Sequence, residues 1–217
     1  MKLIASLLIA AALVAPALSN AAEPAAPAAK VDLAKGEATY NAICAACHGP
    51  EGNSGVPAYP KLAQQHPDYL VKQLQEFKSG KRANAIMMGM SAGLSDADMK
   101  NVAAWLGSKT SAANFAKEKD LVVLGERIYR GGVADRQIAA CAGCHNPTGA
   151  GIPAQYPRLA GQHADYTMAQ LNAFREHGNK GAGQNVGRGN SAQMSGVAAK
   201  LNDREIKAVA DYVAGLR

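Results

Sequence analysis

The feature that most constrains this chain is an internal duplication. The pentapeptide CAACH at residues 44–48 recurs as CAGCH at residues 141–145, and the same offset of 97 residues carries YPKLA at 59–63 onto YPRLA at 156–160. This register holds for about thirty residues, and insertions that belong in loops then shift it in the second copy. The repeat predicts two copies of one structural unit within the 217 residues.

Each of the four cysteines lies in a C-x-x-C-H motif. Four cysteines in an exported chain would ordinarily form two disulfides, but in this motif the thiols bond to the vinyl groups of haem and the neighbouring histidine ligates its iron. A thioredoxin-like redox pair would need a strand-helix context, and a zinc site would need further ligands nearby. The motifs therefore predict two covalent haem c groups, attached through Cys44, Cys47, Cys141 and Cys144 and ligated by His48 and His145.

The composition agrees with a chain that folds around a large cofactor. Hydrophobic residues make up 48% of the sequence, yet about a fifth of all residues are alanine and only 5% are aromatic, so side chains alone would build a thin core. A flat apolar porphyrin supplies the missing buried surface. The formal charge of +6 is modest, and the basic residues are scattered singly, which argues against nucleic-acid binding.

Each half predicts three helices and no strand, so the expected fold class is all-α. The first helix is expected at 33–47 and, in the second half, at 122–131. The second helix starts just after a histidine in both halves, at 66–80 and 163–178. A polar linker of small residues near 107–119 separates the two halves.

The third helix of each half begins with a capping box. The pairs are Ser95 with Asp98 and Asn202 with Glu205. An apolar stripe follows each box and predicts core positions. These positions are Met99, Val102, Ala103 and Leu106 in the first half and Ile206, Val209, Ala210 and Val213 in the second.

The iron ligand opposite each histidine is expected to be a methionine. Met87 and Met194 each stand seven residues before a leucine that the repeat makes equivalent, and both are expected in a loop ahead of the last helix. A thioether ligand stabilises ferrous iron and raises its reduction potential. Met88 and Met90 are alternatives to Met87. Otherwise packing is the expected role of Met88, Met90, Met99 and Met168.

Three other histidines need a role. His66 and His163 repeat, so they are an alternative pair of distal ligands that would give low-potential haems. Local hydrogen bonding at a helix start, or exposure to solvent, is the role that we favour for both. His177 has no counterpart in the first half and is expected at an exposed helix end.

Two more repeated pairs are expected to tune the haems. Pro60 and Pro157 both lie twelve residues after the ligand histidine, and we expect a backbone carbonyl there to accept a hydrogen bond from the histidine ring. Such a bond would fix the orientation and the basicity of the imidazole. Lys61 and Arg158 are expected either to neutralise haem propionates or to lie on the surface.

The N-terminus has the pattern of a secretory signal peptide. Lys2 precedes an apolar run of sixteen residues, and small residues precede the expected cleavage after Ala21. A membrane anchor is the alternative, but Pro16 interrupts the run and no basic cluster follows it. We therefore expect export to the periplasm. The expected parts are a signal peptide at 1–21, a flexible leader at 22–32 and two cytochrome c domains at 33–115 and 116–217.

The two halves of the mature chain differ in charge. Residues 22–115 contain nine basic and eight acidic side chains, net +1, whereas residues 116–217 contain thirteen and nine, net +4. A more basic second half is expected to orient the protein toward an acidic patch on a partner or toward anionic lipid, as peripheral membrane association would require.

Together these features resemble the cytochrome c4 family of periplasmic di-haem cytochromes. The resemblance rests on the tandem C-x-x-C-H motifs, the paired Y-P-[KR]-L-A segments, the Q-x-F or N-x-F helix endings, the segment YRGG at 129–132 and the spacing from methionine to leucine. It covers essentially all of the mature chain. It implies two cytochrome c domains related by a pseudo-twofold axis, with facing haem edges and with His48/Met87 and His145/Met194 as axial ligands.

The resemblance also implies a function and partners. These are outer-sphere transfer of single electrons in the periplasm, from an upstream cytochrome or a quinol-oxidising complex to a terminal oxidase of the respiratory chain. The competing class is an enzyme, either a di-haem peroxidase or a sulfur-compound dehydrogenase, which needs an open distal site with acid and base groups beside it. Both halves retain a methionine and no such cluster, so we expect no catalytic residue and no small-molecule substrate.

Overall fold

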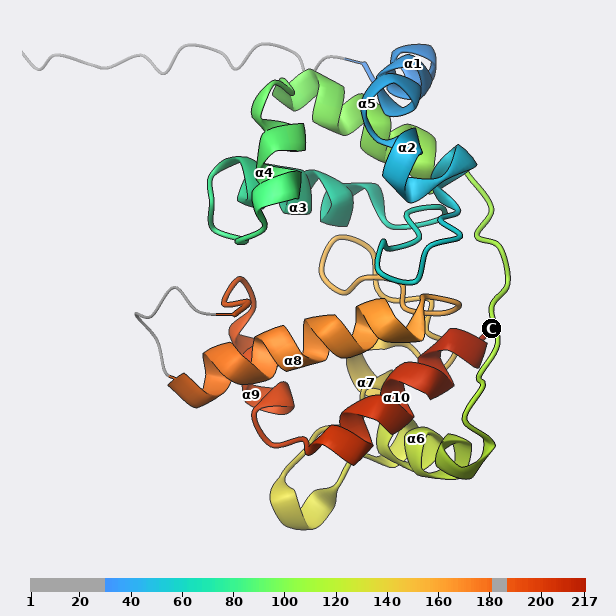
Figure 1. Ribbon diagram of the computed structural model, residues 1–217, viewed down its shortest axis with the longest axis vertical. Helices are drawn as coiled ribbons and strands as arrows, with labels where there is room; N and C mark the ends of the chain where they lie inside the picture. Colours follow the sequence, from blue (N-terminus) through green and yellow to red (C-terminus); the bar gives the residue numbers. More distant parts are fainter. Residues whose placement is uncertain (1–29, 181–186) are drawn as a thin grey trace, which may run out of the picture.

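The computed structural model describes residues 30–180 and 187–217, and helices dominate it (Figure 1). The helices of the first half are α1 (Leu33–Ile43), α2 (Ala45–His48), α3 (Pro67–Lys78), α4 (Ala85–Ala92) and α5 (Asp96–Gly107). Those of the second half are α6 (Lys119–Gly131), α7 (Ala142–His145), α8 (Ala164–Lys180), α9 (Ala192–Ala198) and α10 (Asp203–Gly215). Within these described ranges the β pairing is limited to isolated bridges, so the all-α prediction is confirmed.

The helices form two domains that lie one above the other in Figure 1. Helices α1–α5 make the first domain and α6–α10 the second, and the non-helical segment 108–118 runs along one edge of the molecule between them. The predicted signal peptide lies outside the described residues. Among the helices that are described, none is long and apolar enough to cross a membrane.

A glycine allows the first helix of each domain to cross the last helix closely. A Cβ atom added to Gly36 in α1 would lie 2.2 Å from the carbonyl oxygen of Asn101 in α5. The equivalent glycine, Gly125 in α6, stands in the same relation to Ala208 in α10, at 2.3 Å. The sequence repeat therefore produces the same close helix crossing in both domains.

Both predicted capping boxes and both apolar stripes are confirmed. The Ser95 hydroxyl accepts from the backbone N–H of Asp98, and the Asp98 carboxylate accepts from that of Ser95; Asn202 and Glu205 do the same at α10. All eight predicted core positions in α5 and α10 are at most 4% exposed. The core of the first domain is small, as the composition predicted: its buried cluster consists of Tyr40, Leu70, Val102, Ala103, Trp105 and Leu106.

Several predicted boundaries were wrong. The helix predicted at 33–47 is two helices, because the chain turns at Cys44, where φ is −106° and ψ is −33°. The segments of Met87 and Met194 were predicted as loops but are the short helices α4 and α9. Helix α6 begins three residues before the predicted 122, and the other helices end within two residues of the predicted positions.

The domain interface contains a reciprocal pair of glutamine contacts. The side-chain amide of Gln65 donates to the carbonyl of Arg158 at 2.9 Å and accepts from its backbone N–H at 2.8 Å. The amide of Gln162 makes the same two bonds to Lys61 of the first domain, both at 2.9 Å. Exchange of the same contacts in both directions is what a pseudo-twofold axis between two similar domains produces.

Candidate haem sites

The histidine of each C-x-x-C-H motif is buried and oriented by a carbonyl group. Nδ1 of His48 lies 2.9 Å from the carbonyl oxygen of Pro60, and Nδ1 of His145 lies 3.0 Å from that of Pro157. These are the hydrogen bonds predicted from the twelve-residue spacing. Because Nδ1 donates to the carbonyl, Nε2 is the nitrogen left to ligate iron. Burial lowers the pKa of both histidines, which favours the neutral, ligating form.

A buried tyrosine holds the residue that follows each histidine. The hydroxyl of Tyr40 in α1 donates to the carbonyl of Gly49 at 2.6 Å, and that of Tyr129 in α6 donates to the carbonyl of Asn146 at 2.7 Å. Both acceptor residues have a positive φ, 72° for Gly49 and 71° for Asn146. The chain therefore turns sharply after each histidine, and the first helix of the domain fixes this turn.

The four cysteines are free thiols, as covalent attachment to haem requires. In each motif the first cysteine is half-buried and the second is exposed, and all four are free of disulfides. Burial raises the pKa of Cys44 and of Cys141 to about 11. In the part of the chain that the structure describes, no group of three or more His, Cys, Asp or Glu side chains could hold a metal ion, so the zinc alternative finds no ligand set there.

The two predicted distal methionines occupy equivalent positions in short helices. The backbone N–H of Met87 donates to the side chain of Asn84, the N-cap of α4, and that of Met194 donates to the side chain of Ser191, the N-cap of α9. Both methionine side chains are half-buried. These caps were missed in the sequence because neither belongs to a capping box.

The neighbouring methionines differ from expectation. Met88 and Met90 are 46% and 47% exposed, so the packing role predicted for them was wrong. Met99 is fully buried and Met168 packs against the core of the second domain, as predicted.

Two of the three remaining histidines bond across the domain interface. Nε2 of His66 bonds to the carbonyl of Ala150 at 2.9 Å, and Nε2 of His163 bonds to the carbonyl of Ser54 at 2.8 Å, so each histidine reaches the other domain. Both imidazole rings are therefore engaged at the domain interface, and these bonds are not the local ones that we predicted. His177 lies in the last turn of α8, as predicted, but it is half-buried and not exposed.

Lys61 and Arg158 both lie at the domain interface, but their side chains differ in hydrogen bonding. The ammonium group of Lys61 donates to the carbonyl of Ala112 at 2.8 Å, and the residue is only 8% exposed, which contradicts a surface role. The Nε atom of Arg158 is buried and has no hydrogen-bond partner among the described residues. A buried guanidinium N–H without a partner suits an anionic group such as a haem propionate. The cysteine and histidine residues of the two motifs fit a covalently bound haem, and so does the unpartnered N–H group of Arg158.

Comparisons with known proteins agree with this geometry. The family model for cytochrome c matches residues 33–110 and 124–217. The cytochrome c4 of Thiocapsa roseopersicina is 44% identical over 85% of this chain and 93% of its own length. The crystal structure of reduced recombinant cytochrome c4 from Pseudomonas stutzeri superposes with a TM-score of 0.78 at 40% identity, covering 87% of this chain and all of that one.

A second group of relatives has a different name. A protein of Stutzerimonas stutzeri described as a thiosulfate dehydrogenase electron acceptor is 37% identical over 80% of this chain and 78% of its own length. The two tandem cytochrome c domains, the two C-x-x-C-H motifs and the match over the whole of the solved relative lead to one assignment. The chain belongs to the cytochrome c4 family of di-haem, electron-transferring c-type cytochromes.

Proposed function

We propose that this protein carries single electrons between redox proteins of the periplasm, with His48/Met87 and His145/Met194 as the axial ligands of its haems. In this proposal a signal peptide at 1–21 directs export, and the domains span 33–115 and 116–217. The donor is an upstream cytochrome or a quinol-oxidising complex, and the acceptor is a terminal oxidase. The bound haem supplies a reversible one-electron change at iron.

The observation that carries this proposal is the equivalence of the two sites. Each has a buried histidine fixed by a proline carbonyl and a half-buried methionine three residues into a capped helix. A methionine on the distal side excludes water and exogenous ligands from iron, so the site exchanges electrons rather than transforming a substrate. Because these contacts of the histidine and of the methionine helix already exist in the folded chain, the structural change that accompanies oxidation of the iron would be small.

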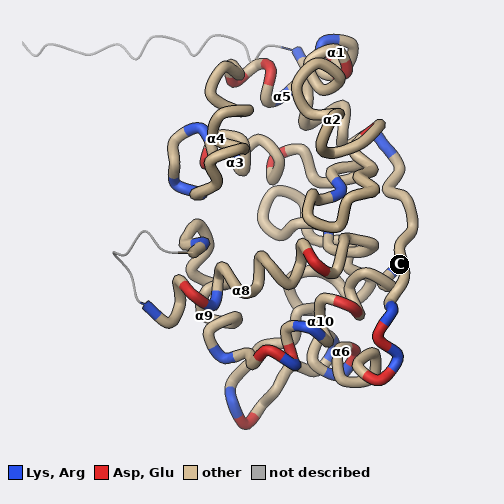
Figure 2. Tube along the Cα trace, in the orientation of Figure 1, with Lys and Arg blue, Asp and Glu red and all other residues tan. Residues whose placement is uncertain are grey.

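The charged residues of the second domain indicate how partner proteins meet it. Figure 2 shows basic and acidic residues mixed over α6 and α10, which suits brief electrostatic encounters better than tight binding.

The relative from Stutzerimonas stutzeri suggests a second candidate for the donor. Because it is described as the electron acceptor of thiosulfate dehydrogenase, that enzyme is an alternative source of electrons for this protein. Stopped-flow reduction of the oxidised protein by a thiosulfate dehydrogenase and by a quinol-oxidising complex would distinguish the two donors. The physiological donor is expected to reduce it at least tenfold faster.

A redox titration of the mature holoprotein tests the function. We expect two high-potential one-electron steps, a far-red iron–thioether absorption band for both oxidised haems, and no binding of carbon monoxide. Met87→Ala should abolish the band of the first haem, whereas Met88→Leu and Met90→Leu should retain it. A wild-type haem that binds carbon monoxide would contradict the proposal and favour a peroxidase or a sulfur-compound dehydrogenase.

A further inference from the structure

Two arginines reach across the domain interface just ahead of the helices that carry the distal methionines. Arg82 precedes α4, which contains Met87, and Arg188 precedes α9, which contains Met194. Each is 8% exposed. The two arginines do not align in the repeat, since Met87 follows Arg82 by five residues whereas Met194 follows Arg188 by six. Their similarity is therefore visible only in the structure.

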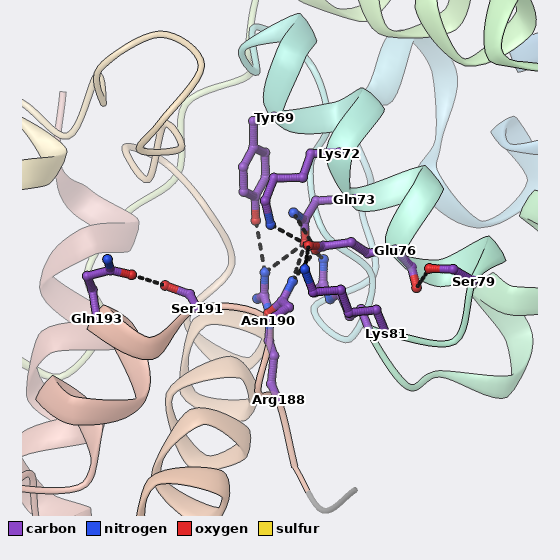
Figure 3. A network of polar contacts seen from close by, with 11 residues as sticks. Tyr69, Lys72, Gln73, Glu76, Ser79, Lys81, Arg188, Asn190, Ser191 and Gln193 are labelled. Carbon is purple, nitrogen blue, oxygen red and sulfur yellow. Dashed lines mark hydrogen bonds and ion pairs between the residues drawn. The ribbon is translucent and has the colours of Figure 1, made fainter. Parts of the chain in front are cut away.

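Arg188 of the second domain binds helix α3 of the first. Its guanidinium group donates to the hydroxyl of Tyr69 at 3.1 Å and to the side-chain oxygen of Gln73 at 2.9 Å (Figure 3). Both acceptors lie on α3, four residues apart, so they present adjacent oxygen atoms on one face of that helix. The segment that leads to Met194 is thereby attached to the other domain.

Arg82 of the first domain makes the corresponding contacts in the opposite direction. It donates to the hydroxyl of Tyr166 at 2.9 Å and to the side-chain oxygen of Gln170 at 2.8 Å, both on α8. Tyr166 and Gln170 are the repeat equivalents of Tyr69 and Gln73. The segment that leads to Met87 is therefore attached to the second domain by the same kind of contact.

Each guanidinium group is also fixed within its own domain. Arg82 stacks on Phe77 at 4.5 Å from the ring centroid, and Arg188 stacks on Phe174 at 4.4 Å. Stacking leaves the N–H groups free to point along the ring plane toward acceptors in both domains. Besides its bonds across the interface, Arg82 donates to Gln73 at 2.7 Å and Arg188 donates to Gln170 at 3.0 Å, each within its own domain. A lysine could not reproduce this combination, because its ammonium group is not planar.

A further bond to the Met194 segment breaks the symmetry. Asn190 donates to the buried carboxylate of Glu76 on α3 at 2.6 Å (Figure 3). The position equivalent to Glu76 in the second domain is Ala173, so the Met87 segment has no matching bond. The Met194 segment thus has two side chains anchored to the opposite domain.

We propose that Arg82 and Arg188 are positioning residues that set the distal ligation of each haem through contacts with the opposite domain. Tyr166 of the second domain thereby helps to hold the Met87 segment, and Tyr69 of the first domain helps to hold the Met194 segment. Gln73 and Gln170 each accept from both arginines, so only the tyrosine contacts are purely crossed. The inference rests on the proposed function, because it takes Met87 and Met194 to be the ligands. Its consequence is that a change at the interface alters the ligand strength of a haem in the other domain.

Removal of one tyrosine hydroxyl at a time tests this crossed dependence. Tyr69→Phe and Tyr166→Phe retain the ring and remove a single acceptor, so both variants are expected to fold. Imidazole competes with methionine for ferric iron, and its affinity for each haem reports how firmly the methionine is held. The haems of the holoprotein are distinguished by the NMR signals of their methionine methyl groups.

We expect Tyr69→Phe to raise the imidazole affinity of the second haem about tenfold, and Tyr166→Phe to do so for the first haem. This change equals the loss of one hydrogen bond to a charged group. Tyr212→Phe is the matched control, because its hydroxyl accepts from Arg130 within one domain at 3.1 Å. It should leave both affinities within twofold of the wild-type values.

Three results would overturn the inference: a larger change at the haem of the same domain, an equal change at both haems, or no change at either. Failure of the proposed function is distinguishable from these, because it would show in the wild-type protein as a haem without an iron–thioether band. A wild type with two such bands and variants without the crossed pattern would leave the proposed function intact and reject the positioning role.

Discussion

His48 and Pro60 are joined by a hydrogen bond of 2.9 Å between the imidazole Nδ1 and the proline carbonyl oxygen, and the pair His145 and Pro157 repeats it at 3.0 Å. The proline ring fixes its own φ, so the carbonyl that follows is held in place. The imidazole is therefore oriented by the backbone and not by another side chain. Donation to this carbonyl increases the electron density that the ring offers to iron.

Pro60→Ala should raise the reduction potential of the first haem and leave that of the second unchanged. A less rigid carbonyl weakens the hydrogen bond, makes the imidazole a poorer donor and so disfavours ferric iron. A weakening of about 1 kcal/mol corresponds to about 40 mV for a one-electron step. Spectroelectrochemical titration would measure it, and Pro157→Ala should move the second haem instead. Equal shifts of both haems in either variant would contradict this explanation.

Gly36→Ala and Gly125→Ala should each destabilise one domain by about 1–3 kcal/mol, since the added methyl group would meet a backbone carbonyl at 2.2 or 2.3 Å. Gly131→Ala is the control, because it lies in the same helix as Gly125 and a Cβ there meets nothing within 4 Å. Thermal unfolding followed by circular dichroism measures the difference. An unfolding midpoint for Gly125→Ala as high as that of the control would show that α6 and α10 can move apart at no cost.

The elements that the sequence predicted well are those determined within one domain. Capping boxes such as Ser95 with Asp98 depend on residues three apart, and the bond from His48 to Pro60 follows from a spacing that occurs twice. Helices α4 and α9 escaped prediction because a single side chain caps each of them. The segment of Met87 is also apolar on all sides, so it lacks the periodicity that identifies a helix.

Contacts between the domains could not be predicted in the same way. His66 and His163 repeat like iron ligands, yet each binds a backbone carbonyl of the other domain. A repeat shows which residues are equivalent but not whether they face the cofactor or the second copy. Arg82 and Arg188 were missed for a further reason, because an insertion places them out of register.

Arg158→Gln should lower the reduction potential of the second haem more than Lys61→Gln lowers that of the first. Arg158 has a buried N–H without a partner in the described part of the chain, whereas linker carbonyls already engage the ammonium group of Lys61. Loss of a positive charge near a haem would favour ferric iron and so lower the reduction potential. Titration of both variants would reveal the order, and a larger shift for Lys61→Gln would contradict it.

Glu76 should make the domain interface sensitive to acid. Its carboxylate is buried in α3, where burial alone would raise its pKa, but the hydrogen bonds from Lys72 and Asn190 and the charge of Lys81 hold the pKa below its usual value of 4.5. The unfolded chain therefore binds more protons than the folded one as the pH falls below about 4.5. The stabilisation from Glu76 is fully present above that pH and is lost as the pH falls through the lowered pKa.

Thermal unfolding of the wild type and of Glu76→Gln between pH 7 and pH 3 measures this contribution. The variant should unfold at a lower temperature than the wild type at pH 7, and the two curves should approach each other as the pH falls, because the wild-type carboxyl group takes up a proton. Glu37→Gln, at an exposed position of α1, should follow the wild type throughout. A difference between Glu76→Gln and wild type that is as large at pH 3 as at pH 7 would show that the side chain acts by packing and not by its charge.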